Sequence, residues 1–258
     1  PFTSINFGTD TSNEGRMVSR WLLDASIAGI GKYYLTPIFP ISIFKYKKGI
    51  NDKEGTINYD LKKHAIKSLS KRIYPNIVNC DFSQNFEDPS NPDTAMATMG
   101  CRTMMGFDRH GLGYSKVGRG NVCPTTMNLP RIGIRHGICT GERKKPDIDG
   151  FWEELDEVLK LTETSLIDRF YHVCAQSVES AKFMYKNGTI ADFERASFKG
   201  IYESMKHGTL AVGYIGIAEM CNALFGKDHS EDNEVHKFAL KVVKYINEFC
   251  KEASDRNN

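Results

Sequence analysis

A cysteine lies between a glycine and an arginine in the stretch TMGCRTMMG, residues 98–106. Arg102 is a permanent cation beside Cys101, and it can lower the pKa of the thiol or hold a phosphate group. Gly100, on the other side, allows a tight turn and a close backbone approach. Local chemistry leaves two interpretations open: a reactive thiol, and a structural thiol, which is the commoner role of a single loop cysteine.

Other sequence motifs for chemistry are absent. The sequence contains no GxxxxGK[ST] phosphate loop, no HExxH, no CxxC pair and no GxSxG nucleophile turn. The glycine-rich stretch GLGYSKVGRGN, residues 111–121, does not join a strand to a helix, so a flexible loop is the preferred interpretation. The seven histidines are scattered, and the sequence therefore predicts no metal site.

Composition places the chain among globular proteins. Its 258 residues are 40% hydrophobic and 26% charged, with a net charge of +2. Neither a nucleic-acid surface nor a membrane partner is expected from that balance, and no apolar run is long enough to span a bilayer. Seven widely spaced cysteines without a secretion signal favour a reducing, cytoplasmic setting. The chain begins at Pro1, which suggests a piece of a larger protein.

The elements that must position Cys101 alternate along the chain. Hydrophobic patterns predict strands within residues 1–7, 36–46, 75–82, 123–134 and 209–220, and helices within residues 9–32, 60–72, 149–188, 191–206 and 231–253. A polar, glycine-rich stretch without a long element, residues 83–122, separates the first three strands from the last two. Alternating strands and helices predict parallel pairing, and hence an α/β layer or barrel.

Five stretches, in this order, resemble the anaerobic (class III) ribonucleotide reductases, a family of glycyl-radical enzymes. They are PFTSINFGTDTS, GIGKYYLTPIFPISIF, MGCRT, GRGNVCPTTMNLPRI and GTLAVGYIGIAE, which together span nearly the whole chain. The resemblance implies an α/β fold: the parallel-stranded middle part of a ten-stranded barrel, in which a finger loop joins two five-stranded halves. Residues 1–258 would form a single domain, with the finger loop at about residues 83–122.

The resemblance also assigns roles to residues. Cys101 matches the cysteine that becomes a thiyl radical, and Met99 matches a methionine typical of members that use formate as reductant. Asn121 is the first choice for a polar active-site asparagine, and Asn128 is the second choice. The remaining candidates for substrate binding are Arg102, Thr103 and Glu219.

The implied chemistry is removal of the ribose 2′-hydroxyl group. A thiyl radical takes the 3′ hydrogen reversibly, the 2′-hydroxyl leaves as water, and a reductant completes the reaction. Such a site must exclude water so that the radical survives. The implied partners are a ribonucleoside triphosphate, formate, the remaining segments of the reductase, an S-adenosylmethionine iron–sulfur activase and, in the complete enzyme, a second copy of the chain.

Departures from the family limit the expectation. The RVCGY-like glycyl-radical motif and the four-cysteine zinc site near the family's C-terminus are absent here, as is the N-terminal regulatory cone. No cofactor is expected to be bound by this chain alone, and the chain alone is expected to be inactive. The family's second, substrate-side cysteine would lie upstream of Pro1, and Cys80 is interpreted as a strand residue of the barrel wall rather than its substitute.

Two alternatives remain open. One is a different glycyl-radical enzyme of the pyruvate formate-lyase type, although that type has two adjacent cysteines in its finger loop and this chain has only Cys101 there. The other is a non-catalytic nucleotide-binding or assembly module that retained the fold and lost the reaction.

Overall fold

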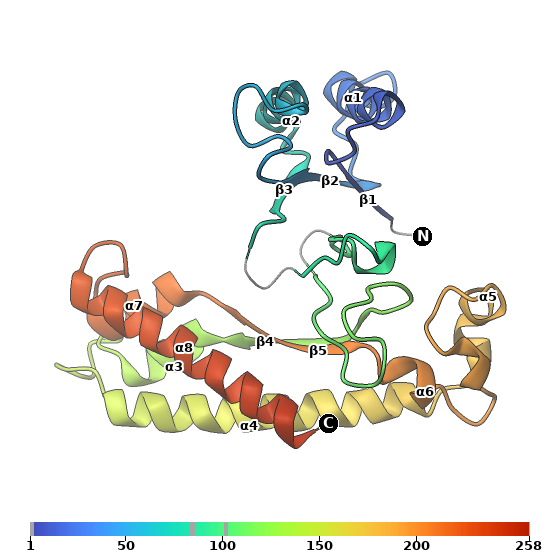
Figure 1. Cartoon of the computed structure of the whole chain (residues 1–258). Coiled ribbons are helices and arrows are strands. Elements are labelled where there is room, and N and C mark those ends of the chain that lie inside the picture. The colour runs from blue at the N-terminus through green and yellow to red at the C-terminus, as the bar shows by residue number, and fades with distance from the viewer. Residues whose placement is uncertain (1–2, 83–85, 101–102, 258) are drawn as a thin grey trace. The chain divides into compact units, whose positions relative to one another are not determined.

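The computed structural model describes residues 3–82, 86–100 and 103–257 (Figure 1). Its internal packing divides the chain into two compact units, Pro1–Gly120 and Asn121–Asn258, which are described separately below. The single domain expected over residues 1–258 stays a prediction.

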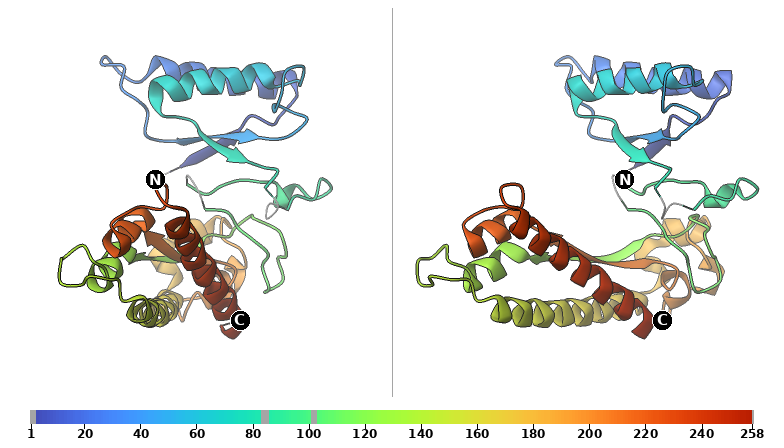
Figure 2. Two further views of the ribbon diagram at one scale, coloured as in Figure 1. Left: turned by 90° about the vertical axis from the view of Figure 1, so that its left-hand side faces the viewer. Right: turned by 60° about the vertical axis from the view of Figure 1, so that its left-hand side comes forward.

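The first unit is built on a parallel sheet with two helices on one side of it (Figures 1 and 2). The strand order is β1-β2-β3, and both neighbouring pairs are parallel, as the sequence predicted. Its elements are β1 (Ser4–Phe7), α1 (Asn13–Ala28), β2 (Ile41–Tyr46), α2 (Tyr59–Arg72), β3 (Asn76–Asn79) and the short 3₁₀ helix η1 (Pro92–Thr94).

Alternation along the strands gives this sheet two different faces, because successive side chains point to opposite sides. The face toward the helices is apolar, and its core consists of Phe7, Leu23, Phe44, Leu61 and Ala65. The opposite face carries polar side chains, including Asn6 of β1 and Lys45 of β2. Ser12 caps α1 by accepting a hydrogen bond from the Gly15 N–H (3.1 Å), which satisfies one free donor of the first turn.

Two fully buried asparagines hold the loops that follow β1 and β2. The amide nitrogens of Asn51 and Asn58 both donate to the Gly8 carbonyl, at 3.0 and 3.1 Å. Gly8 has a φ of +109°, and a Cβ there would meet the Phe44 ring at 2.7 Å, so only glycine fits. The sheet's carboxyl-terminal edge is therefore fixed by directional bonds as well as by apolar packing.

The second unit pairs two parallel strands and covers them with helices (Figure 1). Its strands are β4 (Asn121–Asn128) and β5 (Thr209–Ile215), and its longer helices are α3 (Leu129–His136), α4 (Ile148–Cys174), α7 (Ile217–Phe225) and α8 (Asn233–Arg256). Four short pieces lie between α4 and β5: η2 (Val178–Ala181), α5 (Lys182–Lys186), η3 (Phe193–Arg195) and α6 (Tyr202–Met205).

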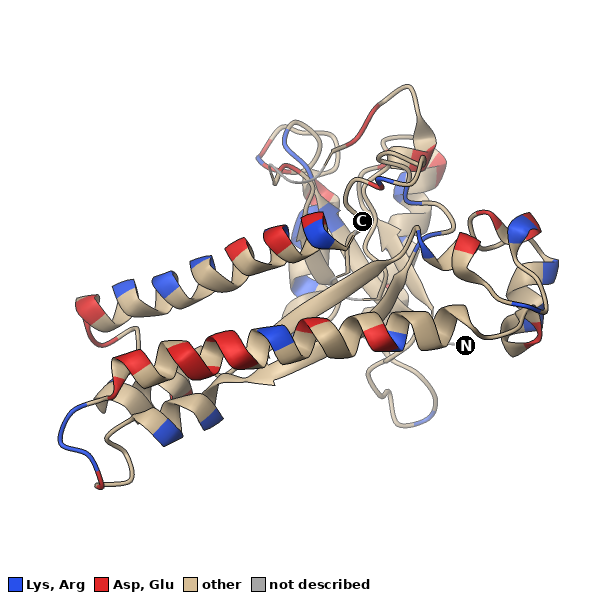
Figure 3. Cartoon of the chain, turned by 90° about the horizontal axis from the view of Figure 1, so that it is seen from below, with Lys and Arg blue, Asp and Glu red and all other residues tan. Residues whose placement is uncertain are grey.

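One large apolar core holds this unit together. Phe151, Leu155 and Leu159 recur at helical spacing on α4 and are fully buried, and they meet apolar residues of α3, α7 and α8. Charged positions recur along the rest of α4 and α8 (Figure 3). Both helices are thus amphipathic, which is the pattern that predicted them.

The sequence misjudged the carboxyl-terminal ends of both strands in this unit. The strand expected to reach residue 134 ends at Asn128, where Asn128 caps α3 and Pro130 occupies its first turn. The strand expected to reach residue 220 ends at Ile215, and Gly216, in a left-handed conformation, starts α7. Both apolar runs are a strand followed at once by a helix, which hydrophobicity alone does not separate.

The helices expected between residues 149 and 206 are also shorter than predicted. α4 ends at Cys174, and the stretch 191–206 contains only η3 and α6, because Asp192 and Gly200 both adopt positive φ values that interrupt a helix. The coarse fold is confirmed as α/β with parallel strands. The described residues do not close a barrel. Over the same residues, no helix combines the length and apolar composition needed to cross a bilayer.

Candidate active-site loop

The segment that leads to Cys101 lies extended against the sheet of the first unit. Its side chains alternate: Thr94, Met96 and Thr98 are buried, whereas the residues between them are exposed. This period of two is that of a strand lying on a surface. We call residues 94–99 the loop stem.

Asn6 holds the loop stem at Thr98. Its Nδ2 donates to the Thr98 carbonyl at 3.0 Å, and its Oδ1 accepts from the Thr98 N–H at 3.1 Å. Both backbone groups of a buried residue are thereby satisfied by one side chain. Asn6 lies on the face of β1 opposite the helices, so the loop stem covers that face of the sheet.

A second pair of side chains holds the loop stem at Met96. Lys45 Nζ donates to the Met96 carbonyl at 3.0 Å, and the Met96 N–H donates to the Glu87 carboxylate. Glu87 also pairs with Lys47 at 2.5 Å. Burial alone would raise the pKa of Glu87, but the hydrogen bonds from Lys47 and from Met96 N–H hold it below its usual value. The hydrogen bond to Glu87 raises the pKa of Lys47 in turn.

A narrow turn follows the loop stem. Met99 and Thr103 exchange backbone hydrogen bonds, at 2.8 Å from Met99 N–H and 3.3 Å from Thr103 N–H. Gly100, inside this turn, has a φ of +60°, which agrees with the tight turn predicted for it. Cys101 and Arg102 lie outside the described residues.

Met99 and Thr103 are thus brought together by their backbones. The Met99 side chain is 43% exposed, and its Cε and Sδ lie 3.6 and 3.7 Å from the point where a Cβ on Gly120 would be. These are ordinary van der Waals distances, so the thioether packs beside Gly120. Thr103 is half-buried.

Asn121 and Asn128 occupy different surroundings. They are the first and last residues of β4, which separates them by roughly 23 Å at about 3.3 Å per residue. Asn128 is exposed, and its Oδ1 accepts the Arg131 N–H at 3.1 Å as the cap of α3. The Oδ1 atom of Asn121 is buried and has no hydrogen-bond partner among the described residues. One small site cannot contain both asparagines.

Glu219 is not on a strand, as the sequence suggested, but in the first turn of α7, where it is exposed. It follows the carboxyl end of β5, the end at which Asn128 terminates β4. Glu219 and Asn121 therefore lie toward opposite ends of the β4–β5 pair. An acidic side chain in the first turn of a helix interacts favourably with the helix dipole, and this interaction gives Glu219 a structural role.

Cys80 directly follows β3, and its N–H donates to the Tyr46 carbonyl at 2.8 Å. Its side chain is buried, and burial raises the pKa of the thiol even though Lys45 and Lys47 lie near enough to lower it. A thiol protonated in this way is a poor nucleophile. Its place at a strand end is in keeping with the interpretation of Cys80 as a residue of the sheet.

Sequence reasoning missed the residues that hold the loop stem, namely Asn6, Lys45 and Glu87. A usable signal existed for two of them. Asn6 in SINF and Lys45 in ISIFKY are strongly polar residues next to the large apolar residues of their strands. A polar residue on a covered sheet face needs a hydrogen-bond partner, and here that partner is the loop stem.

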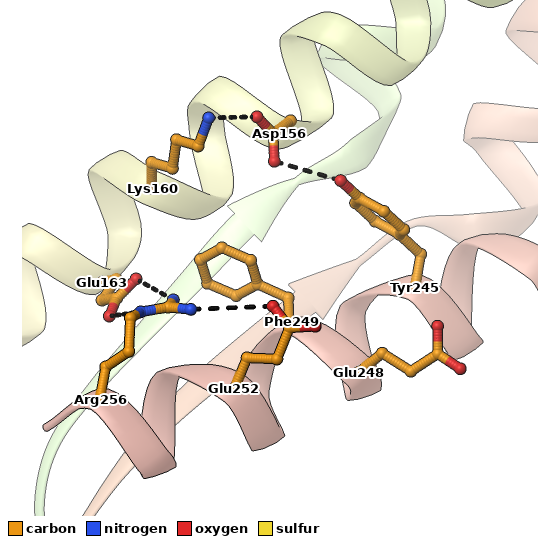
Figure 4. Close-up of a pocket in the computed structure, with 8 residues that line it drawn as sticks. All are labelled: Asp156, Lys160, Glu163, Tyr245, Glu248, Phe249, Glu252 and Arg256. Carbon is orange, nitrogen blue, oxygen red and sulfur yellow. Dashed lines mark hydrogen bonds and ion pairs between the residues drawn. The ribbon is translucent and has the colours of Figure 1, made fainter. Parts of the chain in front are cut away.

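A surface groove lies elsewhere, between α4 and α8 (Figure 4). Its charges are satisfied within the fold: Arg256 pairs with Glu163 at 2.8 Å, and Asp156 pairs with Lys160 at 2.6 Å and accepts from the Tyr245 hydroxyl at 3.1 Å. The groove lies between two helices, and its charged side chains form ion pairs that stabilise the fold. Within the described ranges, no cluster of histidine, cysteine, aspartate or glutamate side chains could hold a metal ion.

Fold and loop together define an α/β protein in which side chains of a parallel sheet hold an extended, cysteine-bearing loop. The model of one family, anaerobic ribonucleoside-triphosphate reductase, matches residues 1–258. The chain belongs to this family, and the pyruvate formate-lyase alternative is set aside.

Curated relatives agree with the family match. The chain is 35% identical over 241 residues to the anaerobic ribonucleoside-triphosphate reductase of Escherichia coli, covering 91% of this chain and 31% of that protein. It is 30% identical over 254 residues to the Haemophilus influenzae protein of the same name, covering 97% and 34%. For the Enterobacteria phage T4 protein, also of that name, identity is 31% over 231 residues, covering 88% and 37%. The chain thus spans about a third of the length of these relatives.

Proposed function

We propose that this chain supplies the radical cysteine, Cys101, and part of the substrate pocket of an enzyme that reduces ribonucleoside triphosphates to deoxyribonucleoside triphosphates. The observation that carries the proposal is the family match over residues 1–258, with the MGCRT motif inside it. The relatives are named anaerobic ribonucleoside-triphosphate reductases. The transfer of that activity to this chain is our inference, because the chain spans about a third of their length.

In the proposed reaction, the sulfur radical of Cys101 takes the 3′ hydrogen atom of the ribose, so that an S–H bond forms and the C3′–H bond breaks. The 2′-hydroxyl then takes up a proton, and its C2′–O bond breaks so that it leaves as water. Formate supplies two electrons and the hydrogen that takes the place of the 2′-hydroxyl, and formate is oxidised to carbon dioxide. The S–H group of Cys101 returns its hydrogen to C3′, which restores the sulfur radical.

The geometry around Cys101 supports a positioned loop. The Met99–Thr103 bridge and the positive φ of Gly100 narrow the chain to a turn at this motif. A radical residue must be held within a fraction of an ångström of its target, because hydrogen transfer depends steeply on distance and orientation. A turn anchored on both sides meets that requirement better than a free loop.

Asn121 supports the substrate part of the proposal. Its buried, unpartnered Oδ1 is a hydrogen-bond acceptor, and a buried acceptor without a partner costs about 1–3 kcal/mol. A ribose hydroxyl is a donor that would satisfy this atom. The formate anion offers acceptors only, and it would be bound by the Asn121 amide N–H groups instead. Asn128 already uses its oxygen as a helix cap, so Asn121 remains the first choice.

The finer features belong to the same proposal. The described strands would be part of a ten-stranded barrel, with residues 83–122 as its finger loop and Met99 as the mark of formate as reductant. The glycyl radical and the activase that installs it would come from outside these residues, as would the second copy of a dimer. Arg102 and Thr103 would bind substrate, and the setting would be cytoplasmic.

The test is anaerobic deoxynucleotide formation by the chain in the full length that its gene encodes, activated by a cognate activase. We expect Cys101→Ser to abolish product, with Cys80→Ser as the matched control that retains it. Product from the Cys101 variant would overturn the radical role. An inactive parent protein that still binds ribonucleoside triphosphates would favour the non-catalytic module. Equal product without formate would overturn the choice of reductant.

A further inference from the structure

We propose that Asn6 is a positioning residue for the reaction: its amide fixes the loop stem at Thr98, directly before the turn whose sequence contains Cys101. This inference rests on the proposed function, because it concerns the same loop. Asn6 precedes Thr98 by 92 positions and lies on β1, so the bond ties the loop to a strand of the parallel sheet.

The chemistry of the contact requires an amide. The Thr98 N–H can only donate and its carbonyl can only accept, so the partner must present one acceptor and one donor side by side. Asn6 does so, at 3.1 and 3.0 Å. A carboxylate of the same shape would satisfy the N–H and face the carbonyl with a second oxygen. A leucine of similar size would satisfy neither group.

The loop stem has no strand beside it to replace these bonds. Met96 and Thr98 make no backbone–backbone hydrogen bond in the described part of the chain, and their four backbone groups are met by Asn6, Lys45 and Glu87. Both residues are almost fully buried, at 1% and 4% exposure. Water cannot take over when a side-chain partner is removed, so the loop stem would move.

Asn6 is the holding residue nearest the turn. Thr98 is followed directly by Met99, whose N–H and carbonyl pair with Thr103 to close the turn around Gly100. Lys45 and Glu87 act two residues earlier, at Met96. We therefore expect a change at Asn6 to reach the turn more directly than a change at Lys45 or Glu87.

The sheet offers a matched control for the test. Asn76 of β3 pairs with Ile43, which pairs with Asn6, so the two asparagines lie in one row on the same sheet face. No side-chain hydrogen bond is made by Asn76 within the described ranges. Asn76→Asp and Asn76→Leu therefore repeat the chemical changes of Asn6→Asp and Asn6→Leu without removing a hydrogen bond to the loop stem.

The first measurement is hydrogen exchange of the Thr98 amide in the protein at the full length that its gene encodes. We expect Asn6→Leu to raise the exchange rate about tenfold, as the loss of a buried hydrogen bond implies, and Asn76→Leu to leave it unchanged. At neutral pH, Asn6→Asp should lose part of the protection: one carboxylate oxygen can still accept the Thr98 N–H, but the other repels the Thr98 carbonyl and displaces the loop stem. Protection should return as the introduced carboxyl is protonated, since its O–H then donates to the Thr98 carbonyl. A merely structural asparagine would not give this pH-dependent recovery.

The second measurement is turnover. We expect Asn6→Asp to lower kcat about tenfold with little change in KM, and to raise the alkylation rate of Cys101 by iodoacetamide, because the thiol is no longer held in place. The Asn76 variants should match the parent protein in both. Unchanged Thr98 exchange in both Asn6 variants would overturn the positioning role, whatever the activity. If Cys101→Ser stays active while Asn6→Leu speeds the exchange of the Thr98 amide, the proposed reaction is wrong, but Asn6 still holds the loop stem.

Discussion

The two units use polar side chains in different ways. In the first unit, Asn6 and Lys45 project from strands onto the loop stem, and Asn51 and Asn58 hold the turns at the strand ends. In the second unit, Asn128, Asp147 and Asp232 cap helices around one large apolar core. A loop that must point in one direction needs directional bonds, whereas a scaffold needs buried volume. The comparison predicts different sensitivities for the two units.

The largest effect is expected in the core of the second unit. Phe151 is fully buried and packs edge-on against Trp152, at 5.5 Å between ring centroids. Phe151→Ala should lower the free energy of unfolding of this unit by about 3–5 kcal/mol, through lost burial and a cavity. Each unit contains one tryptophan, Trp21 or Trp152. Urea unfolding followed by Trp152 fluorescence in a Trp21→Phe background would measure the loss.

The same experiment can break the comparison. With Trp152→Phe, the remaining Trp21 reports on the first unit, and Phe151→Ala should leave its unfolding midpoint in place. A midpoint that moves equally for both tryptophans would mean that the units unfold as one cooperative body.

The next effect concerns the buried asparagines of the first unit. Asn51 accepts from the Lys47 N–H at 2.9 Å and donates to the carbonyls of Gly8 and Lys45 at 3.0 and 2.8 Å. Asn51→Ala leaves these groups buried without partners and should cost about 2 kcal/mol of unfolding free energy. Asn13→Ala, at an exposed position of α1, should change it by less than about 0.5 kcal/mol. Equal losses in the two variants would refute the directional role of Asn51.

A helix cap of the second unit should matter less. Asp232 accepts from the N–H groups of Glu234 and Val235 at 2.9 and 3.3 Å at the start of α8. Asp232→Ala should cost about 1 kcal/mol, while Asp232→Asn, which keeps the acceptor, should cost little. Thermal unfolding of the two variants compares them directly. Similar losses would assign the effect to the ion pair with Lys227 instead of the cap.

The smallest effect is expected at the ion pairs between α3 and α4. Burial alone would raise the pKa of Glu154, but hydrogen bonds from Arg135 at 2.7 Å and His136 at 2.8 Å hold it below 4.5. A lowered carboxyl pKa adds stability above the unfolded-state value, and that stability is lost as the pH falls through the folded-state value. Glu154→Gln should cost about 0.5 kcal/mol at neutral pH.

The acid dependence provides the measurement for this pair. Urea midpoints from about pH 6 to about pH 3 should fall less steeply for Glu154→Gln than for the parent protein, because one group that binds a proton on unfolding is gone. Glu153 lies on the same helix and makes no side-chain hydrogen bond or ion pair with the other described residues, so Glu153→Gln is the control. Parallel curves for parent and variant would rule out a contribution from Glu154.

Local pattern was enough for the elements of the first unit and for the long helices α4 and α8. The sequence predicted all five strands and their parallel pairing, because apolar runs and amphipathic periods are properties of neighbouring residues. The ends of β4 and β5 were misplaced because a strand and the helix after it form one apolar run. The NLP and YIG stretches contain the signals, an asparagine cap with a proline and a left-handed glycine, that mark those ends.

The sequence by itself determined the family, through motifs in a fixed order, and with it the candidate residues Cys101, Met99 and Asn121. Only the tertiary structure decided which groups hold the loop stem and which asparagine already uses its side-chain oxygen as a helix cap. Asn6 and Thr98 are 92 residues apart, and Asn121 differs from Asn128 in the partner of one oxygen atom. Such facts depend on contacts between distant segments, and no local pattern of residues contains them.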